Sequence, residues 1–485
     1  MIKYKIILLI LGILLLVESV FMLLSTVVAL AYSGNDIFSL AISSFITFFV
    51  GFVLWIAFRK ADKKVERRES YIIVSSAWFL MSLFGALPYF FFWKFASFPD
   101  AFFESVSGFT TTGSSVISNL ESMPHGLLFW RSLTQFIGGL GFIVFSMAFI
   151  SIIKTGETKL YSAESTWLSQ NKIHPRNQNT AMRIIIIYLS FTALEVILLW
   201  LGGMSLFDAV CHSFTTMSSG GFSTHDASIA AYHSPYIEYV IIFFMIISGV
   251  NFSVLYFLVT LKFTRAFKNT EFKFYLSFLF GVSIILALIL MIYNDFQVEE
   301  SFRDSLFHVI SIVTTTGFST SNYLLWHPGG IWILLFFLML VGGSSYSTSG
   351  GLKMIRLHIL LKNVLNEFKR IIHPHAIIPI RYNKIAINTQ TNNNILIFFV
   401  IYVFIVVLGT IVMDLTKPEL DPITAFGATV SSLANVGISI GDIGHSSNYS
   451  EVNSFGKLFL SFLMIVGRLE IFTVLVLFTK SFWKK

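Results

Sequence analysis

The sequence of 485 residues predicts an all-α membrane protein with ten transmembrane helices. Its composition is 55% hydrophobic and 12% charged, with a mean hydropathy of +0.77, which excludes a soluble enzyme of ordinary surface polarity. Its apolar runs are long enough to cross a bilayer, for which a helix needs about 20 residues. These runs lie at about 6–31, 37–58, 71–93, 127–153, 183–204, 236–261, 274–293, 331–360, 395–415 and 455–480.

Basic residues predict the direction of these spans, because short loops that carry Lys and Arg stay in the cytoplasm. They gather at alternate junctions, around 59–68, 154–183, 262–273 and 353–384, and at both tails, which places 27 of 33 on one side. We therefore expect both termini in the cytoplasm. The net charge of +7 is then explained by topology, so we expect no nucleic-acid partner. We expect the first span to be retained, because its apolar run is longer than a signal-peptide core.

Four short polar segments, each between two spans, match one another. They are residues 100–113, 208–221, 304–317 and 424–437; the first and third share Thr-Thr-Thr-Gly, and the second and third share Gly-Phe-Ser-Thr. Non-helical backbone at membrane depth survives only where protein or water satisfies it, so we expect re-entrant helices of about twelve residues, each with an extended return from its glycine. The charge pattern puts all four on the outer face. They predict an N-terminal helix pair (1–69) followed by span, re-entrant loop, span repeats at 70–178, 179–269, 270–384 and 385–485.

These segments predict one pore for cations. We expect Asp100, Asp208 and Asp304 to cap the outer ends of their helices, while the negative dipole ends point at the pore centre. Glycine tolerates dihedrals that turn successive carbonyls toward one line, and rings of carbonyls can replace the water shell of potassium. Any one segment could be an ordinary turn between helices, but four in register favour a pore. The expected lining residues are Thr111, Thr112, Gly113, Ser219, Gly220, Gly221, Thr315, Thr316, Gly317, Asn435, Val436 and Gly437.

Two features lie in spans beyond these segments. Arg468 stands deep in the last span, where an unpaired Arg costs about 2.5 to 3.5 kcal/mol, so it needs either a buried carboxylate as a partner or a wet cavity. Glu470 is a poor partner, because residues two apart do not share a helix face. The eighth span contains a run that cannot be a continuous helix, so it is either unwound in the membrane or a surface loop after a helix that ends at its first glycine. The run is Gly342, Gly343, Ser344, Ser345, Tyr346, Ser347, Thr348, Ser349, Gly350 and Gly351.

The motifs resemble those of the bacterial Trk/Ktr potassium-uptake superfamily over the whole chain. They stand at 110–113, 220–226, 314–318 and 467–472, and the extra N-terminal pair of spans favours the Trk branch with its TrkH-type membrane subunit. The resemblance implies a homodimer in the bacterial inner membrane with one potassium pore per subunit. It also implies control by a cytoplasmic nucleotide-binding ring of the TrkA type. Potassium, and rubidium with it, is then the transported ion, and we expect no other cofactor.

The same resemblance implies roles for single residues. Glycine at all four filter positions, including Gly113, implies potassium selectivity. The run 342–351 is similar to an intramembrane loop that blocks the passage until the partner moves it, and Arg468 is then expected to repel ions and to hold that loop closed. This chain departs from the family pattern at Tyr346, where glycine is expected, and at Ile438, where the pattern after the fourth glycine has proline.

Two other classes of function are weighed against the pore. A membrane-embedded enzyme is disfavoured because the eleven histidines form no His-Glu-x-x-His pair, and Glu104 reads as a structural acid bonded within its own helix. An alternating-access cation carrier can also be built from repeats, but four copies in one orientation favour a pore. The sequence leaves open whether transport is downhill or coupled to protons.

Overall fold

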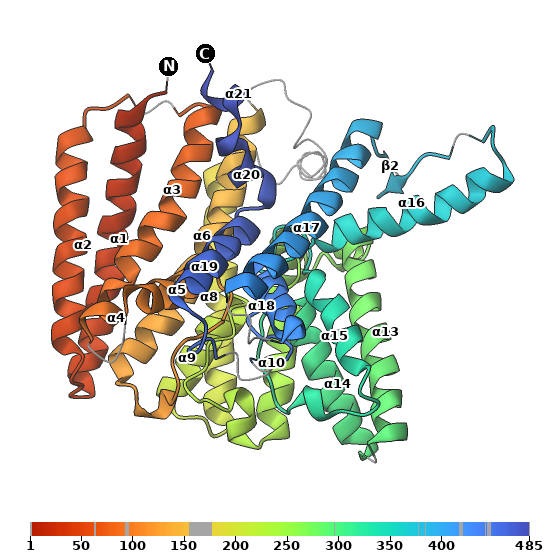
Figure 1. Cartoon of the computed structure of the whole chain (residues 1–485), viewed down its shortest axis with the longest axis horizontal. Coiled ribbons are helices and arrows are strands. Elements are labelled where there is room, and N and C mark those ends of the chain that lie inside the picture. Colours follow the sequence, from red (N-terminus) through yellow and green to blue (C-terminus); the bar gives the residue numbers. More distant parts are fainter. Residues whose placement is uncertain are drawn as a thin grey trace.

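The computed structural model describes residues 2–62, 65–92, 97–154, 177–294, 296–376, 378–383, 385–416, 421–441, 443 and 448–484. The described chain is helical except for loops and one short antiparallel hairpin, β1 (Arg381–Tyr382) with β2 (Ile385–Ala386). The longest helices stand side by side, and the two termini lie at the same end of the molecule (Figure 1). The predicted all-helical membrane class agrees with this architecture.

Six helical stretches are long and apolar enough to cross a membrane, among the residues that the structure describes. They are α1 (Tyr4–Ala31), α2 (Ile37–Phe58), Arg68–Phe91 in α3 (Arg67–Gly85) and α4 (Leu87–Phe91), Met182–Leu201 in α8 (Asn177–Leu201), α13 (Thr270–Tyr293) and α17 (Thr389–Thr416). Two bent helix pairs raise this number to eight if each is one span. The total of ten spans remains a prediction.

Two predicted spans are broken, which corrects the expectation of one helix each at 236–261 and 455–480. The first consists of α10 (Pro235–Ser248) and α11 (Phe252–Val259), which meet at 113°. The second consists of α19 (Ser454–Arg468) and α20 (Ile471–Leu475) with η4 (Val476–Phe478), which meet at 111°. The polar residue at each break explains its geometry: Asn251 caps α11 by accepting from Ser253 N at 2.8 Å, and Glu470 has a φ of 59°.

Four short helices correspond to the four polar segments. They are α5 (Phe98–Phe109), α9 (Leu206–Met217), α14 (Val298–Val313) and α18 (Pro422–Ala434), of 12, 12, 16 and 13 residues. The expectation that three Asp residues are the N-caps is wrong. Ser97 and Ser205 occupy the cap positions, and their hydroxyls donate to Asp100 and Asp208 at 2.8 and 2.7 Å. Ser205 Oγ also accepts from Asp208 N at 3.0 Å and so caps α9. Asp304 lies inside α14, because that helix begins at Val298.

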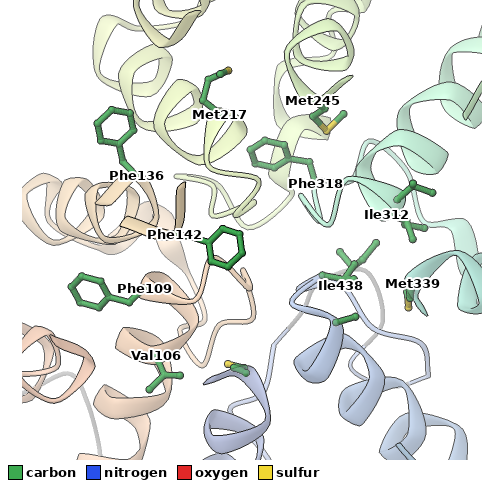
Figure 2. Close-up of a cluster of buried hydrophobic side chains, with 14 of the residues drawn as sticks. Val106, Phe109, Phe136, Phe142, Met217, Met245, Ile312, Phe318, Met339 and Ile438 are labelled. Carbon is green, nitrogen blue, oxygen red and sulfur yellow. The ribbon is translucent and has the colours of Figure 1, made fainter. Parts of the chain in front are cut away.

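Each short helix is followed by another helix of the core. These second helices are α6 (His125–Lys154), α10, α15 (Ile331–Leu340) and α19. Their buried apolar side chains, with those of the short helices, surround one common centre (Figure 2). The remaining elements are α12 (Phe263–Ala266), α16 (Met354–Ile372), α21 (Lys480–Trp483), η1 (Leu120–Ser122), η2 (Ser228–Tyr232) and η3 (Tyr323–Leu325).

Candidate functional site

All four short helices end in the same backbone conformation. A left-handed residue follows each helix, and a glycine with positive φ stands two positions later. A residue other than glycine at positive φ is uncommon, so four at matched positions form one repeated conformation. The first residues are Thr111, Ser219, Thr315 and Asn435, with φ of 52°, 56°, 57° and 56°, and the glycines are Gly113, Gly221, Gly317 and Gly437, with φ of 90°, 75°, 82° and 93°.

The residue between them closes each helix end. Its N–H donates to the carbonyl five residues earlier, which is the long bond of a Schellman motif. The N···O distances are 2.9 Å (Thr112 to Ser107), 2.8 Å (Gly220 to Thr215), 2.8 Å (Thr316 to Ser311) and 3.0 Å (Val436 to Ser431). The N–H of this middle residue is therefore satisfied within its own segment.

The four segments contact one another in a closed ring. A Cβ built on Gly113 would come closer than 3.0 Å to the carbonyl oxygen of Gly220, and the same holds from Gly221 to Thr316, from Gly317 to Val436 and from Gly437 to Thr112. The contacts therefore run from the first segment through the second, third and fourth and back to the first. Figure 2 shows the four groups of ribbon converging on this centre. We call residues 111–113, 219–221, 315–317 and 435–437 the ring segments.

The structure thus brings together all twelve residues that the sequence predicts at a pore axis. All of them are buried except the half-buried Gly113, Gly221 and Gly317. Both the positive φ and the neighbouring oxygen make a side chain unfavourable at the four glycine positions. Glycine is therefore required here for local conformation and for packing between segments.

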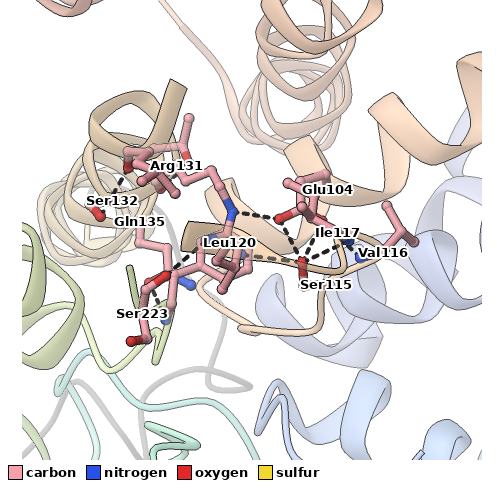
Figure 3. Close-up of polar contacts among 12 residues, drawn as sticks. Glu104, Ser115, Val116, Ile117, Leu120, Arg131, Ser132, Gln135 and Ser223 are labelled. Carbon is pink, nitrogen blue, oxygen red and sulfur yellow. Dashed lines mark hydrogen bonds and ion pairs between the residues drawn. The ribbon is translucent and has the colours of Figure 1, made fainter. Parts of the chain in front are cut away.

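A buried ion pair supports the first ring segment (Figure 3). Arg131 Nε lies 2.7 Å from Glu104 Oε1, and the two side chains are 2% and 0% exposed. Glu104 also accepts from Val116 N at 3.0 Å, and Arg131 donates to Ser223 O at 3.0 Å. Glu104 is structural, as expected, but its partners lie on α6 and on the return after Gly113, which corrects the expectation of bonds within its own helix. Two opposite charges in predicted membrane segments were the signal for this pair.

Neutralising one member of this pair should destabilise the protein strongly. For Glu104→Gln we expect a loss of about 3 to 5 kcal/mol, because it leaves the Arg131 charge buried without its partner. The thermal midpoint of the purified protein in detergent measures the effect. Glu367→Gln is the control, because its ion pair with Arg370 is 47% and 63% exposed. Equal midpoints for Glu104→Gln and the control would contradict this account.

The run 342–351 is not helical, as the sequence predicts, and it is not a surface loop. Helix α15 ends at Leu340 and α16 begins at Met354. The ends of the loop lie together, because Gly342 N donates to Leu352 O at 2.8 Å. Its small polar residues are at most 7% exposed: Ser344, Ser345, Ser347, Thr348 and Ser349. The loop therefore lies in the protein interior, and its two ends meet.

This loop contacts three ring segments at their left-handed residues. The hydroxyls of Thr348 and Ser219 are 2.8 Å apart, and Gly350 N donates to Thr315 Oγ1 at 2.7 Å. A Cβ on Gly350 would meet Ala434 O and Asn435 within 3.0 Å. The loop consequently packs directly against the ring.

Arg468 also binds the loop. It is 1% exposed, its guanidinium donates to Thr348 O, and Cζ lies 4.5 Å from the centre of the Phe142 ring. Glu470 pairs with Arg356, in agreement with the expectation that it does not pair with Arg468.

Lys353 was not found from the sequence. Its Nζ donates to Ser349 O and lies 5.4 Å from the centre of the Phe142 ring. Two buried cations therefore flank one aromatic ring beside the loop. The signal in the sequence was a lysine two residues after the last glycine of the interrupted run.

Comparison with known proteins agrees with this arrangement. The family model TrkH, described as a cation transport protein, matches residues 37–485. The chain belongs to the TrkH family. It is 35% identical over 484 residues to the Trk system potassium uptake protein TrkH of Escherichia coli (strain K12), covering 98% of each chain. The protein of the same name from Halomonas elongata is 35% identical over 485 residues, covering 99% of each. The resemblance stated from the motifs is therefore confirmed.

A solved structure of the TrkH family extends the match to the fold. The crystal structure of the potassium transporter TrkH from Vibrio parahaemolyticus matches with a TM-score of 0.90 at 32% identity, and the match covers 100% of both chains. These relatives are named as potassium transporters, which points to a transport protein rather than an enzyme.

Tyr346, where the resemblance leads us to expect glycine, adopts a conformation that suits glycine. Its φ is 58°, and its carbonyl accepts a hydrogen bond from Phe252 N at 3.3 Å. Glycine takes positive φ at no steric cost, whereas a bulky residue is strained there. The loop in this chain therefore holds a bulky residue in a backbone conformation that favours glycine.

Proposed function

We propose that this chain is a potassium-selective uptake channel subunit. The closed ring of four matched segments is the observation that carries the proposal. Carbonyl oxygens of the ring segments would replace the water shell of potassium. The C-terminal ends of α5, α9, α14 and α18 would add negative dipole ends that favour a cation at the centre. Membership of the TrkH family, whose relatives are named for potassium uptake, supports potassium as the ion.

The proposal includes the arrangement in the membrane. The chain would form ten spans, with four repeats around one pore at 70–178, 179–269, 270–384 and 385–485 and an N-terminal pair at 1–69. The chain would lie in a bacterial inner membrane with both termini in the cytoplasm, in keeping with the basic residues at alternate junctions. A homodimer with one pore per subunit, and a cytoplasmic nucleotide-binding ring of the TrkA type, would complete the system.

The loop 342–351 would be the gate. It packs against the ring through Thr348 and Gly350, so an ion leaving the ring would meet it next. Opening would require the loop to give up the bond from Arg468 to Thr348 O and the bond from Gly350 N to Thr315. The buried charge of Arg468 would also repel a cation while the loop is closed.

Tracer rubidium uptake into liposomes that contain the purified chain tests the function. We expect uptake that potassium competes for and sodium does not. Uptake with equal competition by sodium would contradict a potassium-selective ring. No uptake by the wild type, together with none by a variant lacking residues 342–351, would contradict the pore itself.

Removing the charge of Arg468 should raise the basal flux. We expect Arg468→Gln to increase rubidium uptake at least about tenfold, because the variant loses both the repulsion and a charge-assisted bond of about 1.5 to 3 kcal/mol. Arg370→Gln, on the exposed end of α16, is the matched control. A purely structural role would instead lower the thermal midpoint and leave uptake per folded protein unchanged.

A further inference from the structure

Gln135 of α6 is the feature that carries this inference. The side chain is fully buried at 0% exposure, and it is labelled in Figure 3 on the same helix as Arg131. Its Nε2 donates to Gly220 O at 2.7 Å, and its Oε1 accepts from Phe222 N at 3.1 Å. Gln135 therefore belongs to the first repeat but binds the backbone of the second at Gly220 and Phe222, the residues on either side of Gly221.

The carbonyl that Gln135 binds is one of the four that close the ring. Gly220 O is the oxygen that packs against Gly113. In the part of the chain that the structure describes, no side chain donates a hydrogen bond to the three equivalent carbonyl oxygens, those of Thr112, Thr316 and Val436. One ring carbonyl is thus held by a side-chain donor and three are not.

The sequence shows the same difference between the first repeat and the other three. Gln135 stands three residues before Gly138, and the other second helices carry methionine three residues before a small residue. These are Met245 before Ser248, Met339 before Gly342 and Met464 before Gly467. The three methionines are all 0% exposed, and Figure 2 shows Met245 and Met339 around the same centre. Methionine donates no hydrogen bond, so a donor at this position is specific to the first repeat.

We propose that Gln135 is a specificity-determining residue, which fixes the Gly220 carbonyl at the ring and thereby sets discrimination between potassium and sodium. This inference rests on the proposed function, because it assigns a role within the same ring. An amide donor fixes the direction of a carbonyl and occupies one of its two lone pairs. The Gly220 oxygen then cannot move inward to follow the smaller sodium ion. The second bond, from Phe222 N, prevents the whole segment from shifting.

Gln135→Met tests the proposal, because it gives the first repeat the residue that the other three carry. In the rubidium uptake assay we expect sodium to compete about fivefold more strongly relative to potassium. That change is what one hydrogen bond of about 1 kcal/mol corresponds to at tenfold per 1.4 kcal/mol. Gln135→Glu is measured beside it, since this isosteric change keeps the acceptor for Phe222 N and, when ionised, removes the donor to Gly220 O. Ser132→Ala is the control, because that hydroxyl donates to Leu128 O within α6 and not to the ring.

The ratio of sodium to potassium competition separates the outcomes. A raised ratio in either Gln135 variant, with the ratio of Ser132→Ala unchanged, supports the proposal. Wild-type selectivity in the Gln135 variants overturns it, even if their maximal rate or thermal midpoint falls, because a structural role moves those quantities and not the ratio. A wild-type protein without selectivity for potassium overturns the proposed function, and this inference with it.

Discussion

A Gly113→Ser variant is expected to lose most of its discrimination against sodium. Gly113 has a φ of 90°, and a Cβ there would meet Gly220 O closer than 3.0 Å. The side chain must therefore displace the neighbouring carbonyl or the segment itself. The side chain would add strain of about 1 to 3 kcal/mol to the ring. That free energy corresponds to a change of about 5- to 150-fold in the binding equilibrium of an ion. We place the expected loss of selectivity within that range.

Competition of sodium against tracer rubidium in liposomes measures this effect. Gly281→Ser is the control, because Gly281 lies in α13 with no atom within 4 Å of an added Cβ. The control should keep wild-type selectivity. If Gly113→Ser also keeps it, Gly113 does not contribute to the ion-selective ring, and the contact between Gly113 and Gly220 has no role in selection.

Deletion of Gly342 to Gly351 is expected to leave the pore open. The residues that flank the deletion lie close together, because Val341 and Leu352 are partners in a parallel bridge. It removes the loop that contacts Ser219 and Thr315, and with it the acceptor of Arg468. We expect basal rubidium uptake to rise by at least as much as in Arg468→Gln.

The effects of the loop deletion and of Arg468→Gln on basal rubidium uptake should not be additive. If Arg468 acts mainly through the loop, Arg468→Gln in the deletion background should raise uptake by less than twofold, since residues that share one interaction are coupled in a double-mutant cycle. Full additivity would assign Arg468 a barrier of its own, independent of the loop. Uptake that stays at the wild-type level after deletion, with the thermal midpoint retained, would contradict a gate at 342–351.

The ring could be predicted from the sequence because its geometry depends on residue types that recur. A glycine at positive φ is needed in all four segments, and three of the four carry Ser or Thr around it. The interrupted run was equally visible, because Gly342 to Gly351 has no helix-forming stretch. In both places the backbone conformation restricts the residue types, so the sequence pattern predicts it.

What could not be predicted depends on contacts between distant residues. The breaks after Ser248 and Arg468 lie in apolar sequence, so a hydropathy window reads each as one span. Asp304 matches Asp100 and Asp208 in spacing, but α14 starts about one turn earlier, relative to its Asp, than α5 and α9 do. The ion pair of Glu104 with Arg131 and the hydrogen bonds of Gln135 to the backbone form only when α6 packs on the short helices.

The measurement that tests the central claim most directly is anomalous diffraction from crystals of the protein grown in rubidium. The claim is that four ring segments bind one file of potassium-like ions between them. We expect anomalous density on the axis among the carbonyl oxygens of Thr112, Gly220, Thr316 and Val436, and we expect sodium to leave it in place while potassium displaces it. Rubidium bound elsewhere, with no density on that axis, would contradict the account.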